Sequence, residues 1–126
     1  MSNLNETAPD FNLKNTEKND IALSNYKEKT VVLAFYPGVF TGVCDTEMCT
    51  LRDNMISFND LNAIVLGISV DSPWANAEFA KKYEIKFELL SDYNRDVSKA
   101  YDMIFSGLGG LEGYECSNRG VIIIDG

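Results

Sequence analysis

Two almost unbroken apolar runs constrain the fold of this chain most strongly. The first covers residues 30–36 and the second covers residues 63–70, and both are rich in β-branched side chains. A strand with one solvent-facing side alternates apolar and polar residues, whereas a strand buried on both faces is apolar throughout. The two runs therefore predict central strands of a sheet that is covered on both sides.

Helical patterns follow these strands. From residue 43 to 58, apolar side chains recur every three or four residues, which predicts a helix with one buried face. Ser72 and Pro73 predict the N-cap and the first residue of a second helix, and we expect Trp74 and Phe79 on its inner face. Alternating strands and helices indicate an α/β fold with a central mixed sheet flanked by helices.

Shorter patterns complete the expected order of elements. They predict an N-terminal β-hairpin over residues 11–23, a strand at 87–90, a short helix at 97–103, a glycine-rich loop at 106–113 and a last strand at 120–124. No repeat or linker interrupts the chain, so we expect residues 1–126 to form a single domain. The last strand has no later segment to pair with, which indicates a missing C-terminal portion.

The charge balance narrows the class of partner. Nineteen acidic residues against 11 basic ones give a net charge of −8, so we expect no nucleic-acid partner. The apolar runs are far shorter than the ~20 residues of a membrane span. The N-terminus lacks the pattern of a secretory signal, and three cysteines make a poor disulfide framework. We therefore expect a cytoplasmic protein without a membrane segment.

The chain contains no histidine. This absence excludes Ser-His-Asp and Cys-His catalysis and every histidine-containing zinc or haem site. The spacing of the three cysteines matches no zinc pattern, so we expect neither a metal nor an organic cofactor. A nucleophilic cysteine in this chain must be activated without an imidazole.

Cys44 shows the strongest sign of chemistry. It follows the first apolar run and lies at the start of the predicted helix at 43–58. The first N–H groups of a helix lack partners and carry partial positive charge, so a thiol there is stabilised as the nucleophilic thiolate. Pro37 can rigidify the turn, Thr41 can hydrogen-bond a small substrate, and Arg119 at the entry to the last strand can supply a cation.

These residues carry a resemblance to a known family. Pro37-x3-Thr41-x2-Cys44 is similar to the Pro-x-x-x-Thr-x-x-Cys signature of the peroxiredoxins. Four further stretches match that family in the same order, at residues 8–11, 49–53, 67–73 and 119–125. The resemblance therefore covers nearly the whole chain.

The resemblance implies a thioredoxin-like fold and the reduction of hydrogen peroxide and organic hydroperoxides. Cys44 corresponds to the peroxidatic cysteine, and Pro37, Thr41 and Arg119 correspond to its active-site partners. Glu47 matches an acidic position that orients the arginine. Family members continue with a further strand and a C-terminal helix, so the resemblance also implies a C-terminally truncated domain.

The route that resolves an oxidised Cys44 stays open. Cys49 resembles the resolving cysteine of the PrxQ (bacterioferritin comigratory protein) pattern. Cysteines five residues apart on a helix are too distant for a disulfide, so the first turn would have to unwind. The sequence before Cys44 also resembles the one-cysteine AhpE-like branch, which uses an external thiol. Cys116 is a weaker alternative resolver, and Cys49 as a helix-facing thiol without an obligatory role is the competing interpretation.

The expected partners follow from the same resemblance. They are a peroxide substrate, a thioredoxin- or glutaredoxin-like reductant and, as one option, a second copy in a homodimer. Two other functions compete with the peroxidase. A non-enzymatic redox sensor or interaction module could use the same thiol, and a thioredoxin-like disulfide oxidoreductase would normally have Cys-x-x-Cys where this chain has Cys44-x4-Cys49.

Overall fold

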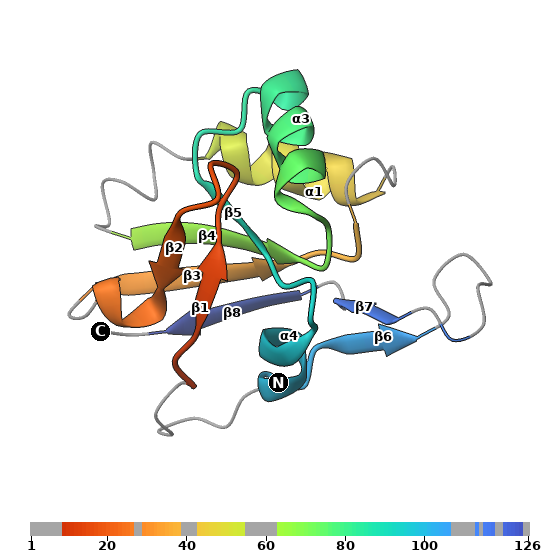
Figure 1. Cartoon of the computed structure of the whole chain (residues 1–126). Helices are drawn as coiled ribbons and strands as arrows, with labels where there is room; N and C mark the ends of the chain where they lie inside the picture. The colour runs from red at the N-terminus through yellow and green to blue at the C-terminus, as the bar shows by residue number, and fades with distance from the viewer. Residues whose placement is uncertain are drawn as a thin grey trace.

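The computed structural model describes residues 9–26, 29–38, 43–54, 63–106, 113, 115–117 and 120–124, with residues 43–45 and 47 described by their backbone alone. Its elements form a mixed α/β fold (Figure 1). No helix in the described part of the chain is long and apolar enough to cross a membrane.

Six strands form one mixed sheet in the order β2-β1-β5-β4-β3-β8. They are β1 (Asn12–Lys14), β2 (Asp20–Ala22), β3 (Thr30–Phe35), β4 (Ala63–Ser69), β5 (Glu88–Ser91) and β8 (Gly120–Ile124). β3, β4 and β5 run parallel, β8 is antiparallel to β3, and β1 is antiparallel to both β2 and β5. The predicted α/β class, N-terminal hairpin and central mixed sheet are confirmed.

The two apolar runs form β3 and β4, which are neighbours near the centre of the sheet. They pair in register from Thr30 and Ala63 to Phe35 and Ile68. Every residue of β3 after the first is buried, and so is every residue of β4 except Ile64. The prediction of two strands buried on both faces is therefore confirmed.

Helices cover both faces of this sheet (Figure 1). α1 (Val43–Asp53) and α3 (Pro73–Tyr83) lie together on one face, and the short α4 (Asp96–Ala100) lies on the other. A 3-10 turn, η1 (Leu23–Tyr26), follows β2. Between the sheet and the α1/α3 layer, one apolar cluster contains Val32, Tyr36, Met48, Val65, Phe79, Ile85, Phe87 and Leu89.

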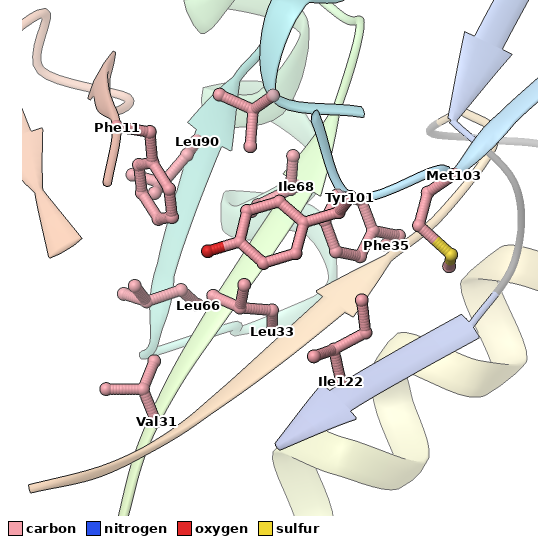
Figure 2. Packing of buried hydrophobic residues seen from close by; sticks show 11 residues of the cluster. Phe11, Val31, Leu33, Phe35, Leu66, Ile68, Leu90, Tyr101, Met103 and Ile122 are labelled. Carbon is pink, nitrogen blue, oxygen red and sulfur yellow. The ribbon is translucent and has the colours of Figure 1, made fainter. Parts of the chain in front are cut away.

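A second apolar cluster lies on the α4 face, with Tyr101 among its members (Figure 2). The Tyr101 ring centre is 5.9 Å from that of Phe35 and 6.4 Å from that of Phe11, and its hydroxyl donates to the Pro9 carbonyl at 2.6 Å. Burial, with a smaller contribution from Asp10, raises the pKa of Tyr101 to about 12. The hydroxyl therefore remains a donor throughout the neutral pH range.

The first helix is shorter than the apolar pattern predicted. α1 ends at Asp53 and Asn54 forms a turn, while residues 55–58 lie outside the described residues. The Asn54 backbone N–H donates to the Leu51 carbonyl (3.1 Å), and its side-chain Nδ2 donates to the Thr50 carbonyl (2.7 Å). Because these bonds satisfy carbonyls of the last turn, Asn54 closes the helix there.

The region after β5 also differs from the prediction. α4 stops at Ala100 instead of residue 103, and Asp102 soon after it has a left-handed φ of 57°. β6 (Ile104–Ser106) and β7 (Glu115–Ser117) form an antiparallel hairpin that the sequence did not predict, because the glycine-rich stretch between them was interpreted as an open loop. Of the predicted glycine-rich loop at 106–113, only Ser106 and Gly113 lie among the described residues.

The predicted last strand is confirmed as β8. It pairs with β3 and lies at the edge of the sheet as far as the structure describes it. Ile122 faces the core, whereas Val121 and Ile123 are exposed.

Candidate active site at the start of α1

The predicted site lies where β3 ends and α1 begins. β3 ends at Phe35, the buried Pro37 and Gly38 follow, and α1 starts at Val43, so that Cys44 is the second residue of the helix. The structure therefore confirms that a strand ends a few residues before this cysteine and that a helix begins beside it. The backbone of Cys44 lies in the first turn of α1, at the positive end of the helix dipole.

Several predicted site residues lie outside what the structure describes. These are Thr41 and Arg119 as a whole, and the side chains of Cys44 and Glu47. Their roles stay predictions. Gly120, the residue after Arg119, pairs with the last residue of β3. The strand that follows Arg119 therefore begins beside the end of the strand that leads into the site.

A buried chain of hydrogen bonds supports the end of β3. The Tyr36 hydroxyl donates to Asn76 Oδ1 (2.9 Å), and Asn76 Nδ2 donates to Ser91 Oγ (3.0 Å). All three residues are buried. The chain ties the residue before Pro37 to α3 and β5. The sequence did not point to Asn76, because an asparagine in a helical segment is mostly exposed.

Met48 packs α1 against the sheet. Its side chain is completely buried and lies, with Tyr36 and Leu89, over Gly67 of β4. A Cβ atom at Gly67 would be only 2.7 Å from Leu89 Cδ2 and 3.0 Å from Met48 Cε. Gly67 is therefore needed for the close approach of α1 to the sheet.

Cys49 and Arg52 lie about one turn apart on α1. Cys49 is a partly exposed free thiol. Arg52 Nη1 donates to the Tyr83 carbonyl at the end of α3 (2.6 Å), and Nη2 forms an ion pair with Asp53 (2.9 Å). The hydrogen bond to Asp53 raises the pKa of Arg52. Arg52 therefore stays charged and joins the C-terminal ends of the two helices.

The environment of the third cysteine is different. Cys116 is completely buried in β7, and its Sγ donates to the Phe105 carbonyl across the β6–β7 hairpin at 3.7 Å. Of the two free thiols that the structure describes, Cys49 is the more accessible.

The start of α3 confirms one prediction and corrects another. Ser72 caps the helix as predicted, since its Oγ accepts a hydrogen bond from a first-turn N–H at 3.1 Å. The prediction that Trp74 lies on the inner face is wrong, because Trp74 is 67% exposed and lies beneath Lys18, whose Nζ is 5.5 Å from the ring centre. Pro73, Asn76 and Phe79 are the buried residues of α3, so its inner face is rotated away from Trp74.

A cavity of about 310 Å³ lies away from α1, between the N-terminal hairpin and α4. Its lining includes Asp92, Tyr93 and Tyr101. The described residues contain no group of three His, Cys, Asp or Glu side chains that could hold a metal ion.

Comparison with known proteins agrees with this arrangement. Residues 4–126 match the AhpC/TSA family. The chloroplast peroxiredoxin Q of Sedum lineare is 40% identical over 119 residues, which cover 92% of this chain and 64% of that protein. The peroxiredoxin Bcp of Bacillus subtilis is 38% identical over 100 residues, covering 79% and 64%. The solved structure of peroxidoxin BcpB from Mycobacterium tuberculosis has a TM-score of 0.85 at 31% identity, covering 95% of this chain and 77% of that one.

The central mixed sheet, with a helix that begins just after its strand β3, has the thioredoxin-like fold of the peroxiredoxins. The chain belongs to the AhpC/TSA family, as a relative of the peroxiredoxins named Q and Bcp. It spans about three fifths of the length of the curated relatives it matches.

Proposed function

We propose that this chain carries the active site of a thiol-specific peroxidase, which reduces hydrogen peroxide and organic hydroperoxides at Cys44. The observation that carries the proposal is the position of Cys44 as the second residue of α1, a few residues after the end of β3. A thiol at a helix N-terminus is favoured as the thiolate, which is the nucleophile. The relatives' common name, peroxiredoxin, supports the same chemistry.

The other site residues have proposed roles in the same step. Thr41 hydrogen-bonds the bound peroxide, and Arg119 stabilises the thiolate and the charge that develops on the leaving oxygen. Glu47 orients Arg119. Pro37, which is buried at the end of β3, shields one side of the thiolate from water.

The peroxidatic step balances without a cofactor. The Cys44 thiolate attacks one peroxide oxygen, so that an S–O bond forms as the O–O bond breaks. The peroxide takes two electrons, and its leaving oxygen picks up a proton to become water or an alcohol. The cysteine is oxidised to the sulfenic acid.

Cys49 or an external thiol then resolves this sulfenic acid. The attacking sulfur forms the S–S bond while the S–O bond breaks, and the hydroxyl leaves as water. Five residues of helix rise about 7.5 Å, whereas a disulfide needs Cα atoms roughly 4.4–6.8 Å apart. Attack by Cys49 therefore requires the first turn of α1 to unwind. A thioredoxin- or glutaredoxin-like protein reduces the disulfide again.

The proposed setting is a single domain over residues 1–126 in the cytoplasm, with a homodimer as one option. The family match over residues 4–126 supports one domain. The free thiols of Cys49 and Cys116 are suited to a reducing compartment. Cell fractionation tests the compartment, and light scattering of the purified protein tests the dimer.

Peroxide consumption tests the function directly. With a dithiol reductant, the wild-type protein should consume hydrogen peroxide, and Cys44→Ser should fall to the uncatalysed rate. Cys116→Ser is the matched control and should retain the rate, because Cys116 is buried in β7. Equal rates for wild type and Cys44→Ser would refute the proposal.

Intact mass after one equivalent of peroxide separates the routes of resolution. A loss of two hydrogens that disappears in Cys49→Ser supports Cys49 as the resolving cysteine. An added oxygen that persists in the wild type supports an external thiol. Oxidation without turnover would favour the redox sensor, and rapid reduction of insulin would favour the disulfide oxidoreductase.

A further inference from the structure

We propose that Met48 and Arg52 are positioning residues, which hold the Cys49 half of α1 in place while the first turn unwinds. The inference rests on the proposed function, since it concerns how oxidised Cys44 reaches Cys49. Its basis is the position of the contacts that fix α1 to the rest of the fold.

The first of these contacts is made by Met48, directly before Cys49. The Met48 side chain is completely buried in the apolar cluster of the α1/α3 face, over Gly67. Unwinding that displaced Met48 would expose an apolar side chain and leave a void above Gly67, and both effects are unfavourable. The chain is therefore held to the sheet at residue 48.

The second contact is made by Arg52. Its Nη1 donates to the Tyr83 carbonyl at 2.6 Å, and its guanidinium also pairs with Asp53. Tyr83 is the last residue of α3, and its carbonyl lies at the negative end of the helix dipole. A charge-assisted hydrogen bond to this helix end fixes the last turn of α1 on α3.

The third contact closes α1 on itself. Asn54 Nδ2 donates to the Thr50 carbonyl at 2.7 Å. Cys49 therefore lies in the segment 48–54, which Met48 and Arg52 hold to the rest of the fold and Asn54 closes at its end. Cys44 precedes all of them. Cys44 then moves toward a stationary Cys49, and the helix stays wound from Met48 onward.

Thr46 and Thr50 offer a matched pair of positions for the test. Both are exposed and lie four residues apart on the same face of α1, but only Thr46 lies in the part that unwinds. Each is replaced by Ala and by Gly in a Cys116→Ser background, so that only two thiols remain. The proteins are equilibrated with mixtures of reduced and oxidised dithiothreitol, and the ratio of disulfide to dithiol is measured by mass after alkylation.

The proposal predicts a difference between the two positions. At residue 46, the Gly variant should favour the disulfide about fivefold over the Ala variant, because glycine weakens only the wound dithiol form. At residue 50, Gly and Ala should give the same ratio, since the helix persists in both forms. Equal shifts at both positions, no shift at either, or failure of the Cys44–Cys49 disulfide to form would each overturn the proposal.

Arg52→Gln tests the side chain itself. The contact of Arg52 with the Tyr83 carbonyl persists in both the dithiol and the disulfide form, so its loss should lower the urea midpoints of the two forms equally. For the same reason, the ratio of disulfide to dithiol should change less than about twofold. Lys14→Gln, which breaks an ion pair with Asp20 in the hairpin, is the control for the lost charge. A larger shift for Arg52→Gln alone would show that oxidation breaks the contact and would overturn the proposal. Dithiothreitol forms the disulfide without peroxide, so these outcomes are separate from failure of the peroxidase assay.

Discussion

The two helices on one face of the sheet, α1 and α3, differ in how their first turns are built. Each follows one of the central parallel strands, and each buries a large apolar side chain completely, Met48 in α1 and Phe79 in α3. α3 satisfies its own N-terminus, with Ser72 as cap and Pro73 as first residue. α1 instead has Cys44 in its first turn. The first turn of α3 is closed by a cap that serves the fold, whereas the first turn of α1 contains the cysteine that we propose as the nucleophile.

The C-terminal ends of the same helices show a related difference. α3 ends in a left-handed residue, Glu84, whose N–H bonds back to the Ala80 carbonyl. α1 ends with the side chain of Asn54 and is tied to α3 by Arg52. Residues adjoining α3 therefore cap both of its ends, and α3 in turn supports the end of α1. Four substitutions test whether α3 supports the fold while α1 contains the proposed site. They are given in order from the largest expected effect to the smallest.

Phe79→Ala should have the largest effect, because it removes the main buried side chain of the supporting helix. We expect a loss of about 3–5 kcal/mol in the free energy of unfolding, measured by urea denaturation. Trp74→Ala is the matched control on the same helix and should change it by less than about 1 kcal/mol, since only the exposed contact with Lys18 is lost. Similar losses for both variants would contradict the assigned inner face of α3.

Gly67→Ala should push α1 away from the sheet. The added Cβ would meet Met48 and Leu89 closely, and we expect a loss of about 1–3 kcal/mol in unfolding free energy. In a Met48→Ala background the loss should be smaller, because one of the two close contacts is gone. Strictly additive losses in this double-mutant cycle would show that the packing of Met48 is independent of the residue at position 67.

Tyr36→Phe should test the hydrogen-bond chain between the site and α3. It removes the donor to the buried Asn76 Oδ1, and we expect a loss of about 1–2 kcal/mol by urea denaturation. Tyr93→Phe, on an exposed ring, should change the stability by less than about 0.5 kcal/mol. Equal unfolding free energies for the two variants would show that the hydrogen bond to Asn76 does not support the end of β3.

Ser72→Ala should have the smallest effect and affect stability alone. Loss of the N-cap should lower the unfolding free energy by about 1 kcal/mol, and Ser72→Asp should restore most of it. Peroxide consumption should stay at the wild-type rate in both variants. A slower rate of peroxide consumption for Ser72→Ala would contradict the division of roles between α1 and α3, because it would show that the start of α3 contributes to peroxide reduction.

Much of the fold could be predicted because it depends on local patterns. The apolar runs of β3 and β4 and the Ser72-Pro73 start of α3 can be recognised within a few residues. The strands β6 and β7 were missed although they are no shorter than β1 and β2, because the glycine-rich stretch between them was interpreted as an open loop, whereas turn-forming residues mark the connection from β1 to β2. The face of α3 was misjudged at Trp74, because hydrophobicity alone does not show which side of a helix meets the sheet.

The candidate site was predictable to a similar extent. The position of Cys44 at a helix start soon after a buried strand followed from the end of an apolar run at Pro37 and the helical period after it, and the structure confirms both elements. The roles of Thr41 and Arg119 followed from their chemistry and position together with the family resemblance, and that of Glu47 from the resemblance alone. All three stay predictions. The buried Asn76 was missed, because its partners Tyr36 and Ser91 lie on other elements of the fold.

The sequence by itself determined the alternation of strands and helices, the cap at Ser72 and the position of Cys44 at a helix start. Each depends on residues that are neighbours in the chain. Only the tertiary structure decided that residue 67 must be small beneath Met48, and that Arg52 joins α1 to the end of α3. These features depend on atoms that the chain brings together from distant positions, and no local pattern records them.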